Sequence, residues 1–255
     1  MGAWVGLLKK EWRLGLPAFL IPLFLTILCL GLGAYGFYRS GEPLVLMAVA
    51  LSAIGGHLLY LPWYMAYSIN GEQGKLHLWL HNPQSGYQLL LAKYVCGLIT
   101  MVLSMTLPYL VLFTLKHHIT FLKGDYLLLF GWLTLCFIVF FSLYLTVWGV
   151  FLWTLSRTLV PYFGRLRWLV MFGLIIVGAW LFSLWESTPL FDVLTHWGAL
   201  EVDFTKVELK VGGDGFEVGL EEGELIYLGS FLYYSVVIFF VFLLSGWLLD
   251  RKVEV

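Results

Sequence analysis

Residues 70–93 read NGEQGKLHLWLHNPQSGYQLLLAK, and this short polar stretch sets the organisation of the chain. It joins two long apolar runs, residues 43–69 and 89–115. Each run exceeds the roughly 20 residues that cross a bilayer as a helix. Between them the stretch carries a Gly-Glu-Gln-Gly turn, a half-apolar helical pattern and an Asn-Pro-Gln-Ser-Gly break. A segment of this kind between two membrane spans indicates a surface on which something docks.

The rest of the chain has the composition of an integral membrane protein. Of its 255 residues, 60% are hydrophobic and only 12% are charged, whereas soluble domains carry roughly 25% charged residues. The apolar runs are continuous and lack the alternating strands of about 10 residues that build a membrane barrel. We therefore expect an all-α integral membrane bundle, one transmembrane domain over residues 1–255. Its six expected spans are residues 16–38, 43–69, 89–115, 126–155, 168–185 and 225–249.

The lysines and arginines are shared unevenly between the two sides of this bundle. With a cytoplasmic N-terminus, ten of them lie inside and five outside. Because cytoplasmic loops are enriched in Lys and Arg, we expect a multi-pass protein of the cell membrane with both termini and residues 70–93 in the cytoplasm. The inner ten are Lys9, Lys10, Arg13, Lys75, Lys93, Arg157, Arg165, Arg167, Arg251 and Lys252. Membrane lipids are expected partners, and nucleic acid is not.

Residues 3–14 predict a helix that lies on the inner leaflet before the first span. Their apolar residues, Trp4, Val5, Leu7, Leu8 and Trp12, form one helical stripe, with basic residues off it. That pattern is typical of an interfacial helix. The alternative is an N-terminal extension of the first span, but Gly15 and Pro17 favour a break between the two.

Residues 186–224 form the one sizeable hydrophilic segment, and it is expected to be external. Ten of the sixteen acidic residues lie in it. Residues 189–200 carry apolar residues at helical spacing and could dip back into the outer leaflet. Residues 207–211 and 216–220 alternate around a Gly-Gly-Asp-Gly turn, which predicts a β-hairpin. Because the segment is too small for a core of its own, it caps the bundle or contacts a partner.

Sequence motifs for chemistry are sparse. The chain has no G-x-x-x-x-G-K-[ST] motif, so it does not hydrolyse ATP by a P-loop mechanism. His77 and His81 have a spacing that suits a metal pair but lack further ligands, so no metal site is expected. His57 lies in the middle of a span and is either a functional polar site or a neutral histidine bonded to a neighbouring helix. No serine–histidine or paired-carboxylate constellation lies in the spans, which disfavours an intramembrane enzyme.

The register of residues 71–87 resembles the cytoplasmic coupling segment of type-2 ABC exporter permeases. In that family a Glu and a Gly lead into a short Leu-rich helix, then a Pro-x-Ser break, an aromatic residue, a Leu triplet and a Lys. Two positions differ, since Lys75 stands where Thr is usual and His77 where an acidic residue is usual. The resemblance implies that the residues coupling the chain to an ATPase are Glu72, Gly74, Leu76, His77, Trp79, Leu80, Pro83, Ser85 and Lys93. It also implies re-entrant external helices between the last two spans.

The function that this resemblance implies is a permease subunit that performs no catalysis itself. A separate ABC ATPase subunit would bind ATP and Mg²⁺, and a second permease, either another copy or a paralogue, would complete the translocation path. The aromatic-rich, charge-poor spans favour an amphipathic or lipid-like cargo moved by alternating access. The alternative is a non-transporting membrane scaffold or sensor that binds a partner through its acidic external segment.

Overall fold

The computed structural model describes residues 2–72, 84–115, 124–201 and 225–251. Within these ranges, six helical segments are long and apolar enough to cross a membrane. The protein is therefore a multi-pass membrane protein of the all-α class, as the sequence predicts. The expected coupling helix and the expected β-hairpin over residues 207–220 lie outside the described residues and stay predictions.

The sequence predicts the positions of the first two spans but not where their helices begin and end. Helix α1 covers Gly2–Ser40, and the second span consists of α2 (Pro43–Gly56), the 3₁₀ turn η1 (His57–Leu59) and α3 (Tyr60–Glu72). Gly41, at a φ of 72°, ends α1 in the left-handed conformation that glycine adopts most readily. The turn η1 ends three residues before Pro62, whose ring excludes normal helical bonding to the preceding turn.

The remaining elements take the chain across the membrane four more times. Helices α5 (Gly86–Thr114) and α6 (Gly124–Thr158) form the third and fourth spans. The short helix α7 (Val160–Phe163) and the 3₁₀ turn η4 (Gly164–Leu166) lead into α8 (Arg167–Glu186). The short helix α9 (Pro189–Thr195) and the antiparallel strands β1 (Ala199–Glu201) and β2 (Leu225–Tyr227) precede the last span, α10 (Leu228–Arg251).

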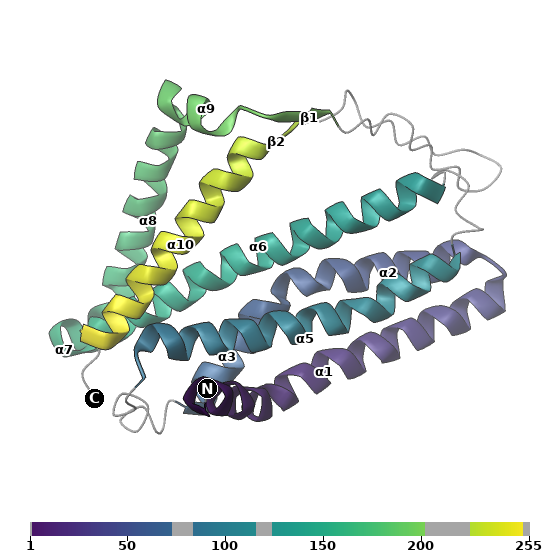
Figure 1. The fold of residues 1–255 in the computed structure, drawn as a ribbon, viewed down its shortest axis with the longest axis horizontal. Helices are drawn as coiled ribbons and strands as arrows, with labels where there is room; N and C mark the ends of the chain where they lie inside the picture. The colour runs from purple at the N-terminus through teal and green to yellow at the C-terminus, as the bar shows by residue number, and fades with distance from the viewer. Residues whose placement is uncertain (1, 73–83, 116–123, 202–224, 252–255) are drawn as a thin grey trace.

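The helices meet at one end of the bundle and diverge at the other (Figure 1). The starts of α1, α5 and α8 lie at the same end as the last residues of α3, α6 and α10. At the opposite end, α8 and α10 lean away from α1, α2 and α5, with α9 across their tips. The main core lies between α1, α3, α5, α6 and α10 and includes Leu61, Tyr64, Met65, Leu90 and Met101.

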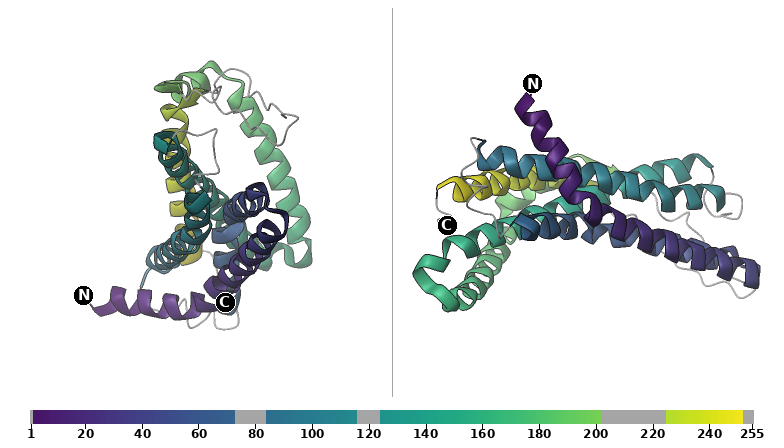
Figure 2. Two further views of the ribbon diagram at one scale, coloured as in Figure 1. Left: turned by 90° about the vertical axis from the view of Figure 1, so that its right-hand side faces the viewer. Right: turned by 90° about the horizontal axis from the view of Figure 1, so that it is seen from below.

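The expected break between residues 3–14 and the first span is not present, because α1 runs without interruption through Gly15 and Pro17. Figure 2 instead shows a bend, with the first turns of α1 at a steep angle to the rest. A proline inside a helix removes a hydrogen bond and kinks the helix without ending it. Whether these first turns lie on a leaflet stays a prediction.

Candidate functional site

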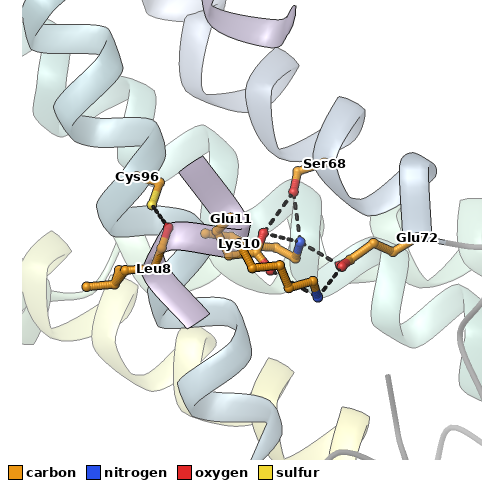
Figure 3. A network of polar contacts seen from close by, with 7 residues as sticks. Leu8, Lys10, Glu11, Ser68, Glu72 and Cys96 are labelled. Atoms are coloured by element: carbon orange, nitrogen blue, oxygen red, sulfur yellow. Dashed lines mark hydrogen bonds and ion pairs between the residues drawn. The ribbon is translucent and has the colours of Figure 1, made fainter. Parts of the chain in front are cut away.

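Four charged side chains from three helices form a closed ring where α3 ends (Figure 3). We call Lys10, Glu11, Glu72 and Lys93 the charged ring. The Lys93 Nζ atom lies 2.7 Å from Glu11 Oε2 and 2.6 Å from Glu72 Oε2. Lys10 Nζ pairs with Glu72 Oε1 and lies 3.5 Å from Glu11 Oε1. Each lysine therefore contacts both glutamates, and the four charges sum to zero.

The charged ring is buried on one side and open on the other. The side chains of Glu11 and Lys93 are 0% exposed, that of Glu72 is 12% exposed and that of Lys10 is 43% exposed. Ser68, one turn before Glu72, completes the inner side, because Lys93 donates to its Oγ at 2.8 Å. Removing charges from water is costly unless each charge finds a partner. The alternating arrangement supplies those partners.

The sequence brings these residues together through ordinary helix geometry. Leu7, Glu11, Gly15 and Ala18 recur every three or four residues and are all buried, so Glu11 lies on the inner face of α1. Glu72 is the last residue of α3, and Lys93 lies about two turns into α5. The charged ring thus joins α1 to the two helices that flank residues 73–85.

A second contact holds the start of α5 to the end of the chain's last helix. The backbone N–H of Gly86 donates to Asp250 Oδ1 at 2.6 Å. Nearby, Gly246 lies against the ring of Tyr87, leaving no room for a Cβ atom. An amide at a helix start has no partner inside its own helix, so the Asp250 carboxylate caps α5 from another span. Residues 72 and 86 are therefore each tied to other helices.

The structure brings together two of the expected site residues, Glu72 and Lys93, as direct ion-pair partners. Ser85 is exposed and is the residue from which α5 begins. The others, Gly74, Leu76, His77, Trp79, Leu80 and Pro83, lie outside the described residues. Four further residues of these contacts were not expected from the sequence: Lys10, Glu11, Ser68 and Asp250. The sequence signal that could have identified Glu11 is its spacing, because it follows Leu7 by four residues and Leu8 by three, on the apolar stripe of the predicted helix.

His57 is buried and bonded on both ring nitrogens. Its Nδ1 atom lies 2.7 Å from the Ala53 carbonyl oxygen and its Nε2 atom 3.1 Å from Ser104 Oγ in α5. The ring also stacks on Tyr60. These contacts match the interpretation of a histidine that bonds a neighbouring helix. His57 also borders a groove of about 880 Å³ between α1 and α2, whose lining is mostly apolar.

Within the described residues, no three His, Cys, Asp or Glu side chains gather as ligands for a metal ion. The two glutamates of the charged ring are occupied by the two lysines. The arrangement is suited to holding helices in register, because each charge is paired across two helices.

Fold and site together define a six-span helical membrane protein with a charged ring, buried on its inner side, at one end. The chain is 28% identical to the uncharacterized protein YhcE of Bacillus subtilis strain 168, over an alignment of 274 positions that covers the whole of both proteins. No family model matches the chain, and no solved structure matches it.

Proposed function

We propose that the chain is the membrane-spanning permease subunit of an ATP-driven ABC exporter. Residues 71–87 would form the cytoplasmic segment that docks on a separate ATPase subunit, which binds ATP and Mg²⁺. The observation that supports this most directly is that both ends of the segment are held by other helices, through the charged ring and through Asp250.

Such anchoring is what a force-bearing segment requires. A loop that only connects two spans can move independently of the bundle, and a push on it would be lost in local motion. Here a displacement at residue 72 reaches α1 and α5 through Lys10, Glu11 and Lys93, and a displacement at residue 86 reaches α10 through Asp250. In this proposal, closure of the ATPase subunits moves four spans together and changes access to the path between two permeases.

The cargo proposed is amphipathic or lipid-like. The groove between α1 and α2 has the size of a small-molecule site, which is typically about 300–1,000 Å³. Its wall is mainly aliphatic and aromatic, with Thr26, Ser52 and His57 as polar groups. A hydrated ion would find few partners there. The second permease is proposed to be another copy or a paralogue, because six spans make half of a translocation unit in the family that the sequence resembles.

Replacing Trp79 tests the proposal. A buried aromatic anchor commonly contributes about 2 kcal/mol or more to an interface. We therefore expect Trp79→Ala to weaken retention of the ATPase about 30-fold and to abolish cargo-stimulated ATP hydrolysis. The measurement is affinity purification of the full chain from membranes, with mass spectrometry of the co-purified proteins.

A matched control is Trp180→Ala, which removes a largely exposed tryptophan from the middle of α8. It should leave ATPase retention unchanged. If the wild-type chain, stably inserted, co-purifies with no P-loop ATPase, the permease proposal is wrong. The scaffold or sensor function would then be favoured, and deletion of residues 202–224 would be expected to release its partner.

A further inference from the structure

We propose that the corner between α6 and α8 is a binding site for the headgroup of an acidic phospholipid. The basic corner, as we call it, comprises Arg157 in the last turn of α6, Arg165 in η4 and Arg167 at the start of α8. The site is independent of the proposed transport activity. The proposed orientation of the chain decides only that the lipid belongs to the inner leaflet.

The three arginines are cations that the described part of the protein leaves unneutralised. None of them forms an ion pair with a described residue. The Nε atom of Arg167 is buried and has no hydrogen-bond partner there. The guanidinium carbons of Arg157 and Arg167 lie 5.6 Å and 5.2 Å from the ring centres of Trp153 and Trp168. Stacking orients each guanidinium group but leaves its N–H groups available for a phosphate.

Apolar side chains stand beside these cations with their surfaces exposed. Tyr162 is 78% exposed, Leu166 65% and Trp168 64%. Aromatic and aliphatic residues mixed with arginines form the amphipathic pattern that settles at the headgroup level of a bilayer. A water-facing loop would have little reason to expose three such residues within seven positions.

The shortness of the corner favours a lipid over a protein partner. Residues 159–166 alone separate the two membrane-spanning helices, and they are folded into the compact turns α7 and η4. Figure 1 shows α7 at the outer edge of the bundle, next to the ends of α6 and α8. The basic corner therefore lies at the depth of the lipid phosphates. An arginine guanidinium group binds a phosphate through two parallel hydrogen bonds, which suits a phosphodiester headgroup.

Lipid retention by the purified full chain tests the site. The protein is extracted from bilayers of phosphatidylcholine that contain a minority of phosphatidylglycerol, and its retained lipids are quantified by mass spectrometry. The wild-type chain should be enriched in phosphatidylglycerol. Each basic residue near an anionic surface contributes about fivefold to binding, so Arg165→Gln combined with Arg167→Gln should lower retention about 25-fold. The Lys variants at both positions should keep most of it.

The matched control is Arg39→Gln, an exposed arginine in the last turn of α1 at the opposite end of the bundle. It should not change retention. If the double variant fails to insert, Arg165→Gln alone decides, because that side chain is exposed. Unchanged retention in the Gln variants, equal retention of phosphatidylcholine, or an equal loss with Arg39→Gln would overturn the proposal. Loss of a co-purified protein without loss of lipid, or stabilisation by inorganic phosphate alone without lipid enrichment, would also overturn it.

Discussion

At the scale of single residues, the charged ring is an unusual way to join helices. Buried ion pairs are often no more stabilising than well-packed apolar residues of the same size, because desolvation offsets attraction. What they do impose is register, since an apolar contact tolerates sliding and a paired charge does not. Lys93 reaches two carboxylates on two different helices and a serine hydroxyl. A rotation or slide of α1, α3 or α5 would leave at least one of these charges buried without a partner.

The Lys93→Met substitution should therefore be severely destabilising. It leaves Glu11 buried with Lys10 as its remaining cation, at 3.5 Å. Removing one partner of a buried pair costs about 3–5 kcal/mol. The Lys93→Met, Glu11→Met double variant should cost less than Lys93→Met alone, because the Lys10–Glu72 pair survives and no buried charge is orphaned. Reversible unfolding in mixed detergent micelles measures the free energy of unfolding of the wild type, of Lys93→Met, of Glu11→Met and of the double variant.

The control for this experiment is Lys9→Met, which changes an exposed neighbour of the charged ring. It should alter the free energy of unfolding by less than about 0.5 kcal/mol. If the costs of Lys93→Met and Glu11→Met simply add, the two side chains do not interact, and the charged ring is not a unit.

Part of this site could be predicted from sequence and part could not. The resemblance of residues 71–87 to a coupling segment points to Glu72 and Lys93, and the structure pairs them. The order of residues does not reveal that pairing, because it depends on how α3 and α5 cross. The sequence does not point clearly to Lys10 and Glu11, because charged residues near a basic N-terminus are typical of a solvent-exposed helix face. The role of Asp250 cannot be predicted from the sequence for another reason, because its partner is the backbone amide of a residue 164 positions away.

At the scale of elements, glycines mark the places where helices approach most closely. A Cβ atom on Gly15 would overlap the hydroxyl group of Tyr64, which is almost fully buried in α3. A Cβ atom on Gly97 would lie 2.6 Å from Leu61 and 2.8 Å from Tyr64. Small residues of this kind let membrane helices pack backbone to side chain. Gly15, which the sequence presents as a helix breaker, therefore has a packing role inside a continuous α1.

Substituting Gly15 should separate these two interpretations. If Gly15 is a contact point, Gly15→Ala forces Tyr64 out of its position and costs about 1–3 kcal/mol, as overpacking does. If it only breaks a helix, alanine should stabilise α1 by roughly 0.5–1 kcal/mol. Unfolding in detergent micelles gives the sign directly.

Gly31→Ala is the control for Gly15, since it lies in the same helix and has open space where the Cβ atom would be. It should be neutral or slightly stabilising. Equal effects at the two positions would show that α1 does not pack on Tyr64.

The number and order of the spans followed from hydropathy, because a bilayer demands long apolar helices whatever their packing. All six expected spans have a matching helical segment. The predicted and observed ends of a span differ where the helix extends beyond the apolar run, as in α6, which ends at Thr158 and not at residue 155. The short helix α9 matches the helical spacing seen from residue 189. The strands β1 and β2 are three residues each, and strands that short carry no usable sequence pattern.

At the scale of the whole molecule, the bundle is tight at one end and open at the other. At the tight end lie the charged ring, the Gly86–Asp250 contact and the basic corner. At the open end, α8 is linked to α10 through Trp185, whose Nε1 donates to the Tyr233 hydroxyl at 3.0 Å. Helix α8 itself buries a single residue, Met171, within the described structure. A bundle fixed at one end and splayed at the other can pivot, which suits a protein proposed to alternate access.

The difference between the tight end and the open end predicts which end of the bundle faces the cytoplasm. The turn between α1 and α2, at Glu42, lies at the open end, and α7, with Tyr162, lies at the tight end (Figure 1). Because Lys and Arg residues gather at the tight end, we expect that end to face the cytoplasm. In a background lacking Cys29, Cys96 and Cys136, a cysteine at Glu42 should react with a membrane-impermeant maleimide in intact cells. A cysteine at Tyr162 should react only after permeabilisation, although the tyrosine it replaces is highly exposed.

Labelling of position 162 but not 42 in intact cells would place the charged ring outside the cell. ATP-driven coupling through residues 71–87 would then be impossible, while the fold and the helix contacts described above would stand.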